Sequence, residues 1–357
     1  MFGTRHTVRL RGIPRLPAIT AMAAMLLWPA AAEAGFSDAF EKYVAEDYGA
    51  ALVAAEPDAE RGNPAAQWLI GTMYLLGKGV EANAEVARGW FEKSAASNYP
   101  PSQAVLGRMF EQGIGGGQDS DEAHILYRLA AEQGYADAAY LLGRQFYHGD
   151  GAPRDRKAAL KWLTVAAEDG NAGAQYLGAR ILLAGEEVTA DPERAEGWLL
   201  SAAEAGHAES QLLLGSTLLN RPGARHTRAV GREWIEKAAA KGLAEAEVRL
   251  GDLYNSGIGG RPDYAAAFAW WQKAAAQSNA EAQLRLARAY TRGRGTARDY
   301  TQAYIMASLS ALQGNVLAAE LREKILLRLR PEEAEQADRE VEALVAPRLA
   351  TGINPSS

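Results

Sequence analysis

The chain has 357 residues, of which 48% are hydrophobic and 23% are charged, and its formal net charge is −6. This composition is too apolar for a disordered chain, and its acidic balance disfavours non-specific binding to nucleic acid. The sequence contains no cysteine, which excludes disulfides, a thiolate nucleophile and a cysteine-ligated zinc site.

The first 34 residues have the organisation of a secretory signal peptide. Four arginines lie before residue 16, residues 16–32 are apolar without a single charge, and Ala32 and Ala34 are small residues at the positions that a signal peptidase reads. We expect cleavage after Ala34 and a periplasmic or secreted mature chain without a membrane anchor. An uncleaved anchor is the alternative, and a mitochondrial transit peptide is disfavoured because it would be amphipathic.

Residues 35–63 are expected to cap the N-terminal end of the fold. They resemble the second helix of an incomplete repeat, in which Tyr48 would lie against the first complete repeat. Terminal units of a repeat array need such a polar outer face to remain soluble.

The central part of the chain repeats with a period of 36 residues and no gap. A Leu-Gly pair such as Leu142-Gly143 is followed three positions later by a large residue such as Phe146, on the same face of a helix. A turn with paired glycines then ends this helix. The period delimits seven repeats, namely 64–99, 100–135, 136–171, 172–207, 208–243, 244–279 and 280–315.

The second half of each repeat predicts another helix, because alanines and large residues recur at spacings of three and four. Such small and large side chains can interdigitate between two helices. No segment alternates with period two, so no strands are expected. A tryptophan column belongs to this half and is expected to pack in the core: Trp90, Trp162, Trp198, Trp234 and Trp270.

These patterns resemble the Sel-one-like repeat (SLR), a relative of the tetratricopeptide repeat. The resemblance covers all seven repeats and implies an all-α fold, a right-handed α-solenoid of antiparallel helix pairs. The resemblance is weaker in the fourth repeat, where Glu187 replaces the second turn glycine, and in the fifth, where Arg221-Pro222-Gly223 forms a different turn. Residues 316–346 are then expected to form two capping helices separated by Pro331, and residues 347–357 a loose tail.

The sequence offers no convincing catalytic, cofactor or metal site. The glycine-rich turns neither follow a strand nor end in Gly-Lys-Ser/Thr, as phosphate-binding loops do. The five histidines lie in different repeat columns, and no Gly-x-Ser-x-Gly motif is present. We therefore expect no enzyme activity, no cofactor and no bound metal.

One set of residues predicts a ligand-binding groove. The resemblance to tetratricopeptide repeats implies that the position after the Leu-Gly pair lines a concave groove, and three consecutive repeats have arginine there. Arginine beside tyrosine is a combination enriched at binding hot spots. Alternatively, these arginines are solvated or pair with acidic neighbours such as Glu111. The predicted groove residues are Arg108, Arg144, Arg180, Tyr140, Tyr176, Tyr147 and Trp68.

The sequence thus favours an exported scaffold or adaptor that holds a protein or peptide partner, with an acidic segment, in its concave groove. An accessory role in envelope polysaccharide or peptidoglycan processes is the alternative, and a hydrolase is the least favoured reading. No nucleic-acid partner is expected, and the oligomeric state is left open.

Overall fold

The computed structural model describes residues 34–221, 225–258 and 261–350, and within these ranges it contains 18 helices and no strand. The prediction of an all-α fold of helix pairs is confirmed. The expected signal peptide up to residue 33, the rebuilt turn at residues 222–223 and residues 351–357 of the expected tail lie outside the described residues. Residues 347–350, also expected in the loose tail, belong instead to the last helix. Along the described ranges, no helix combines the length and the apolar character needed to cross a membrane.

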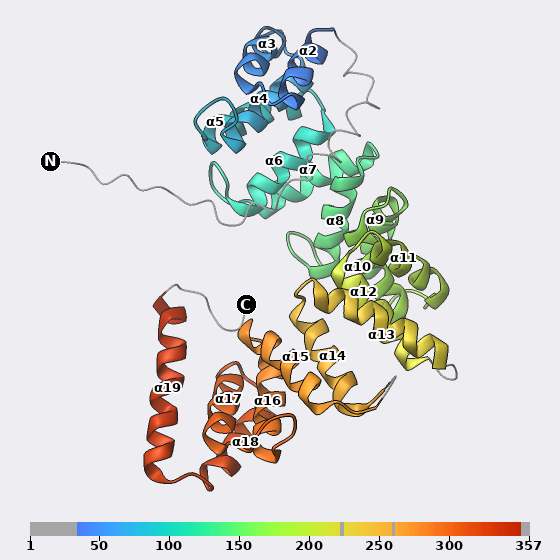
Figure 1. Cartoon of the computed structure of the whole chain (residues 1–357). Helices are drawn as coiled ribbons and strands as arrows, with labels where there is room; N and C mark the ends of the chain where they lie inside the picture. Colours follow the sequence, from blue (N-terminus) through green and yellow to red (C-terminus); the bar gives the residue numbers. More distant parts are fainter. Residues whose placement is uncertain (1–33, 222–224, 259–260, 351–357) are drawn as a thin grey trace, which may run out of the picture. The chain divides into compact units, whose positions relative to one another are not determined.

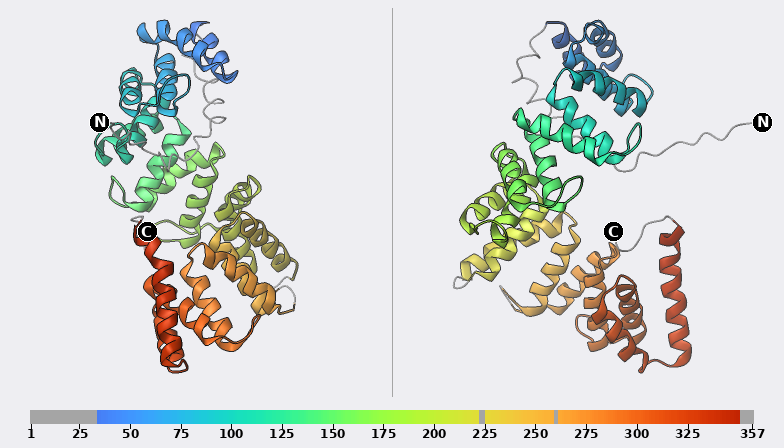
Figure 2. Two further views of the ribbon diagram at one scale, coloured as in Figure 1. Left: turned by 60° about the vertical axis from the view of Figure 1, so that its left-hand side comes forward. Right: turned by 180° about the vertical axis from the view of Figure 1, so that it is seen from behind.

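The chain divides into two compact units, residues 1–174 and 175–357. In each unit, successive helices run antiparallel and form pairs (Figures 1 and 2). The first unit contains α2 (Ala34–Val44), α3 (Tyr48–Glu60), α4 (Pro64–Leu76), α5 (Ala84–Ala96), α6 (Pro100–Gln112), α7 (Ser120–Glu132), α8 (Ala136–His148) and α9 (Arg156–Glu168).

Helix α10 (Ala172–Ala184) contains the boundary between the units. The second unit continues with α11 (Pro192–Glu204), α12 (Ala208–Asn220), α13 (Arg225–Ala240), α14 (Ala244–Ser256), α15 (Tyr264–Ala276), α16 (Ala280–Arg292), α17 (Tyr300–Leu312), α18 (Val316–Leu326) and α19 (Pro331–Ala350).

The helix ends follow from residues at fixed places in the repeat. Helix α6 ends at Gly113, which adopts the left-handed conformation with φ of 67°. Helix α7 then begins after Asp119, whose carboxylate accepts hydrogen bonds from the backbone N–H groups of Asp121 and Glu122 at 3.1 and 3.0 Å. Side-chain caps of this kind also begin the second helices after Asn83, Asp155, Asp191, Asp263 and Asp299.

In the first six repeats, a large side chain of the second helix closes the pair by packing near the small residue of the first; the last repeat has Ala287 and Ala307 at these positions. A Cβ atom added to Gly71 would lie 3.0 Å from the ring of Phe91, and one added to Gly143 would lie 2.8 Å from the side chain of Leu163. Both of these large side chains are buried. They directly follow the tryptophan column, so the core position is one residue later than the sequence pattern indicated.

The expectation that the tryptophan column packs in the core holds only in part: Trp90 and Trp270 pack against core clusters, but the column lies at the edge of the core. Its side chains are only half-buried, and each lies under the cation of a nearby side chain; Lys93 Nζ, for example, is 4.2 Å from the centroid of the Trp90 ring. A lysine or arginine covers each of the other four as well, namely Trp162, Trp198, Trp234 and Trp270.

The second glycine of the turn joins consecutive helix pairs. A Cβ atom at Gly115, where φ is 69°, would lie 2.3 Å from the carbonyl oxygen of Ala84, the first residue of α5. Gly151 approaches the carbonyl oxygen of Ser120, the first residue of α7, in the same way. The turn thus rests on the start of the preceding second helix, at a distance that only glycine permits.

The two ends of the repeat array are covered by further helices. Residues 34–60 form two helices, α2 and α3, where the sequence indicated a single one; Glu46, with φ of 62°, turns the chain between them. At the other end, α18 and α19 both pack against α17. The hydroxyl group of Tyr304 on α17 donates a hydrogen bond of 3.0 Å to the carboxylate of Asp338 on α19.

Candidate functional site

The first helices of successive pairs lie beside one another, as α6 and α8 do in the first unit and α16 and α18 do in the second. In each unit by itself we call the surface that they form the first-helix face: it consists of α4, α6 and α8 in the first unit, and of α12, α14 and α16 in the second. Arg108 lies on α6 and Arg144 on α8, whereas Arg180 lies on α10, in the second unit. The structure therefore brings Arg108 and Arg144 together.

Arg144 is held by Glu111. Its Nη2 atom donates hydrogen bonds to both carboxylate oxygens of Glu111, at 2.9 and 2.8 Å, and the two side chains are 34% and 19% exposed. Burial alone would lower the pKa of Arg144, but the Glu111 carboxylate raises it, and the net pKa is raised. For Arg144 the alternative of pairing with Glu111 is the correct one, so its charge is already compensated.

Arg108 differs from Arg144, because it is half-buried and forms no ion pair within 4 Å with any described residue. Its positive charge acts on Asp137 and Tyr127. Burial raises the pKa of Asp137, and Arg108 opposes this shift. Burial also raises the pKa of Tyr127, whose hydroxyl group donates a hydrogen bond of 3.2 Å to Glu111. Arg108 is therefore the predicted arginine of the first unit that has no direct ion pair among the described residues, although the Asp137 carboxyl group partly balances its charge.

The predicted aromatic residues divide into two groups. Trp68 and Tyr147 are only 8% and 7% exposed, so they belong to the core, and their assignment to the groove is wrong. Tyr140 is half-buried and its ring packs on Gly173. In the second unit, Tyr176 is half-buried beside the ring of His207, with the Arg180 guanidinium 5.6 Å from its centroid.

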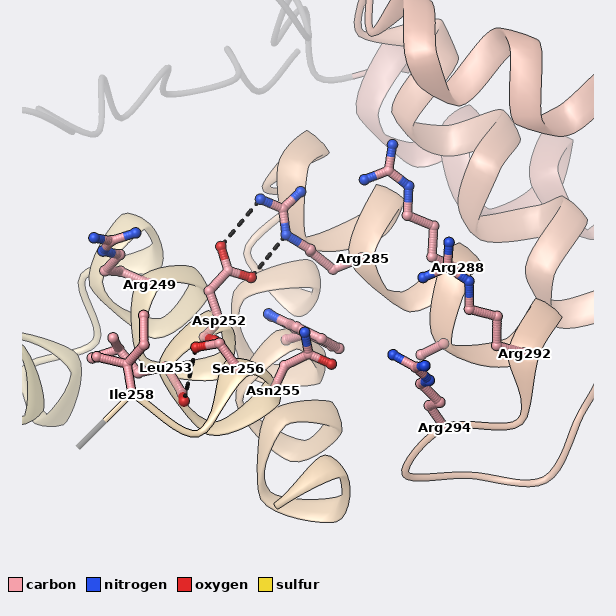
Figure 3. A pocket seen from close by; sticks show the side chains of 12 residues that line it. Arg249, Asp252, Leu253, Asn255, Ser256, Ile258, Arg285, Arg288, Arg292 and Arg294 are labelled. Carbon is pink, nitrogen blue, oxygen red and sulfur yellow. Dashed lines mark hydrogen bonds and ion pairs between the residues drawn. The ribbon is translucent and has the colours of Figure 1, made fainter. Parts of the chain in front are cut away.

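The second unit has a cavity of about 400 Å³ at the first-helix face, beside α14 and α16 (Figure 3). Asp252 on α14 and Arg285 on α16 pair across it through two hydrogen bonds, Nε to Oδ1 at 2.8 Å and Nη2 to Oδ2 at 3.1 Å. Arg285 also pairs with Glu281. The lining of the cavity includes a single carboxylate, that of Asp252, and five guanidinium groups, those of Arg249, Arg285, Arg288, Arg292 and Arg294.

The remaining arginines of the cavity have no carboxylate partner. Arg249, Arg288 and Arg292 form no ion pair with any residue in the described part of the chain, and Arg294 contacts the ring of Tyr264, 5.2 Å from its centroid. In Figure 3, Arg288, Arg292 and Arg294 gather on one side of the Arg285–Asp252 pair and Arg249 lies on the other. The cavity is thus a concave, positively charged site in an acidic chain.

Sequence reasoning missed this cavity as a site. Arg288 occupies the repeat column of Arg108 and Arg144, but its repeat is separated from theirs by repeats with other residues in that column. The usable signal was the spacing of three and four residues between Arg285, Arg288 and Arg292, which places them on one face of a helix. Among the described residues, no group of three histidine, aspartate or glutamate side chains is arranged to hold a metal ion.

Comparison with known proteins gives a family for all seven repeats. A family model described as Sel1 repeat matches residues 64–99, 100–135, 136–171, 172–207, 208–243, 244–279 and 280–315. These are the segments that the period of 36 delimits. No curated protein sequence matches the chain.

Two solved structures share the architecture. One is a protective antigen present in uropathogenic Escherichia coli strains, which displays an SLR fold; its TM-score is 0.80 and its identity 32%, over 84% of this chain and 64% of that protein. The chain thus spans less than two thirds of that protein's length. The other is a Sel1 repeat protein from Oxalobacter formigenes, with a TM-score of 0.61 and 32% identity, over 68% of this chain and 97% of that one.

Proposed function

Because the chain belongs to the Sel1 repeat family, whose members generally mediate protein–protein interactions, we propose that it is a non-catalytic scaffold that holds an acidic segment of a partner protein. The binding surface in this proposal is the first-helix face. This surface replaces the row of Arg108, Arg144 and Arg180 that the sequence predicted, because Glu111 compensates the positive charge of Arg144.

The observation that supports this proposal is the recurrence, on the first-helix faces, of arginines that form no ion pair with a described carboxylate. Arg108 is such a residue in the first unit, and Arg249, Arg288 and Arg292 are in the second. They stand out because the chain as a whole carries a net charge of −6. A guanidinium group binds a carboxylate through two parallel hydrogen bonds, so an acidic segment would supply the missing partners.

The chemistry of the cavity favours binding over catalysis. Arginine remains protonated at physiological pH and does not serve as a general base. Both carboxylate oxygens of Asp252 accept hydrogen bonds from Arg285, so this group is engaged in holding two helices together. A non-catalytic role is accordingly part of the proposal.

The proposed scaffold acts outside the cytoplasm, after removal of residues 1–34. The charge-free apolar segment 16–32 and the small residues Ala32 and Ala34 support this part of the proposal. Intact-mass spectrometry of the protein from a periplasmic fraction should give a chain that starts at Gly35. A chain that retains Met1, or protein found only in the cytoplasmic fraction, would refute export with cleavage at this site.

A peptide-display selection on the immobilised mature chain tests the binding role. The selected peptides should be enriched in aspartate and glutamate, and raised salt should elute them, because exposed and partly exposed ion pairs are screened. Selection of neutral or basic peptides, or retention that is indifferent to salt, would contradict the proposal.

A further inference from the structure

We propose that the cavity beside α14 and α16 is the anchoring pocket for two carboxylates of the partner segment that are separated by one residue. The inference rests on the proposed function and assigns it a site and a ligand pattern. Its starting point is the contrast between five guanidinium groups and one carboxylate in the lining of the cavity.

The Arg285–Asp252 pair makes one part of this site rigid. Arg285 is bound by Asp252 and Glu281 and is 24% exposed, so its guanidinium group is fixed in place with its charge largely compensated. Arg249, Arg288 and Arg292 have no ion-pair partner among the described residues, and of these Arg288 and Arg292 lie together on one side of the Arg285–Asp252 pair (Figure 3). They therefore define where the ligand carboxylates should bind.

The spacing of these two arginines selects the ligand pattern. Arg288 and Arg292 lie four residues apart on α16, and a rise of 1.5 Å per residue separates them by about 6 Å along the helix axis. In an extended peptide, side chains two residues apart point to the same side and lie about 6.6 Å apart. An acidic residue, any residue and a second acidic residue thus match the spacing of the two arginine positions along α16.

The surroundings of the pocket strengthen such pairs. Leu253, Trp271 and Ala289 line the cavity and are 1%, 5% and 4% exposed. Arg288 is half-buried beside this apolar wall, so an ion pair there is less screened than a pair on an open surface, whereas Arg292 is exposed and a pair there is screened more strongly. Arg294 is drawn on the same side as Arg288 and Arg292 (Figure 3) and adds to the local positive charge.

The first arm of the test measures the binding of a fluorescein-labelled Gly-Asp-Ala-Asp-Gly peptide to the mature chain by fluorescence anisotropy. A matched Gly-Asn-Ala-Asn-Gly peptide removes the charges, and a Gly-Asp-Ala-Ala-Asp-Gly peptide changes their spacing. We expect the affinity to fall at least about tenfold for the amide peptide, and to fall for the altered spacing. Equal affinities for all three peptides would overturn the proposal.

The second arm removes the arginines with the double variant R288Q/R292Q. We expect at least about a tenfold loss of affinity with unchanged helicity, because neither side chain pairs with a described residue. The matched control is R128Q/R328Q, which removes two exposed arginines outside the cavity and should bind as the unaltered chain does. Unchanged affinity in R288Q/R292Q would overturn the pocket, and so would equal losses in both double variants.

Further measurements separate a carboxylate ligand from a phosphoryl group, and the pocket from the proposed function. A phosphoserine peptide that binds more tightly than the aspartate peptide, or inorganic phosphate that displaces the peptide at equal concentration, would overturn the carboxylate assignment. If acidic peptides bind the chain but R288Q/R292Q retains them while R108Q loses them, the scaffold proposal stands and the pocket is refuted. If the unaltered chain binds no acidic peptide, both are refuted.

Discussion

Glu111 and Arg144 connect two neighbouring first helices through two hydrogen bonds from a single guanidinium nitrogen, at 2.9 and 2.8 Å. In the second unit, Asp252 and Arg285 connect α14 and α16 at the same sequence separation of 33 residues. In both units, an arginine thus stabilises the first-helix face by binding a carboxylate of the preceding pair. Such arginines should contribute to stability, and the unpaired ones to binding.

Replacing Arg144 with alanine should destabilise the first unit by about 1 to 2 kcal/mol, because it leaves the mostly buried Glu111 carboxylate without its cationic partner and with only the hydrogen bond from Tyr127. Arg108→Ala is the matched control on the preceding first helix, and its effect on stability should be smaller. Urea unfolding followed by circular dichroism measures both. The double variant R144A/E111A should recover part of the loss; a cost for R108A as large as that for R144A would contradict this assignment.

Glu247→Gln should stabilise the chain at neutral pH, by about 1 kcal/mol. Glu247 is 4% exposed in a repeat column where five of the other six repeats have a buried glutamine, such as Gln211 and Gln283, and one has Ala139. Burial raises the pKa of Glu247, while Gln277 and Lys273 oppose the shift.

The sign of the pH dependence follows from this raised pKa. The folded chain binds the proton of Glu247 more tightly than the unfolded chain does, so the stability contributed by this residue falls as the pH rises through its folded pKa. The difference in melting temperature between Glu247→Gln and the unaltered chain should therefore shrink as the pH is lowered below that pKa. A difference that is constant from acidic to neutral pH would show that the charge of Glu247 is not the cause.

Phe91→Ala should lower the free energy of unfolding by about 3 to 5 kcal/mol, as truncation of a buried aromatic side chain does. Trp90→Ala should lower it by less. Phe91 is 1% exposed and packs on Gly71, while Trp90 is half-buried under Lys93. Denaturant midpoints of the two variants give the comparison. A larger loss for Trp90→Ala would restore the tryptophan column as the core position.

Gly115→Ala should lower the free energy of unfolding by more than about 2 kcal/mol. Alanine is strained in the left-handed backbone conformation of this position, and its Cβ atom would clash with the carbonyl oxygen of Ala84. Gly134→Ala is a suitable control, because Gly134 also has a positive φ but nothing lies within 4 Å of an added Cβ atom. Thermal unfolding of both variants isolates the clash from the backbone strain. Equal melting temperatures would show that the close contact between Gly115 and Ala84, which joins consecutive helix pairs, does not affect the stability of the chain.

The helix pairs were predictable because their signals are local: the Leu-Gly pair, the paired turn glycines and the period of 36 all lie within one repeat. The choice between Trp90 and Phe91 for the core was not predictable, since both are large and apolar and adjacent residues differ by a rotation of only about 100° around the helix. Similarly, the sequence indicated one N-terminal helix because the turn at Glu46 has no glycine to mark it.

The candidate site was only partly predictable, because an arginine's role depends on its partner in another repeat. Arg108 and Arg144 occupy the same column, yet only Arg144 pairs with Glu111, which lies on the neighbouring first helix. The spacing of Arg288 and Arg292 is visible in the sequence. That no carboxylate in the described ranges pairs with them becomes visible only when α14 and α16 are placed side by side.

The most direct measurement is site-specific photo-cross-linking from position 255, where Asn255 lines the cavity, in living cells that express the chain. A photoreactive phenylalanine analogue at this position should cross-link to a partner segment that mass spectrometry identifies as acidic, with two acidic residues separated by one. The same cross-link should disappear in the R288Q/R292Q variant. Cross-links to neutral or basic segments, or cross-links that R288Q/R292Q leaves unchanged, would contradict an acidic partner anchored at this cavity.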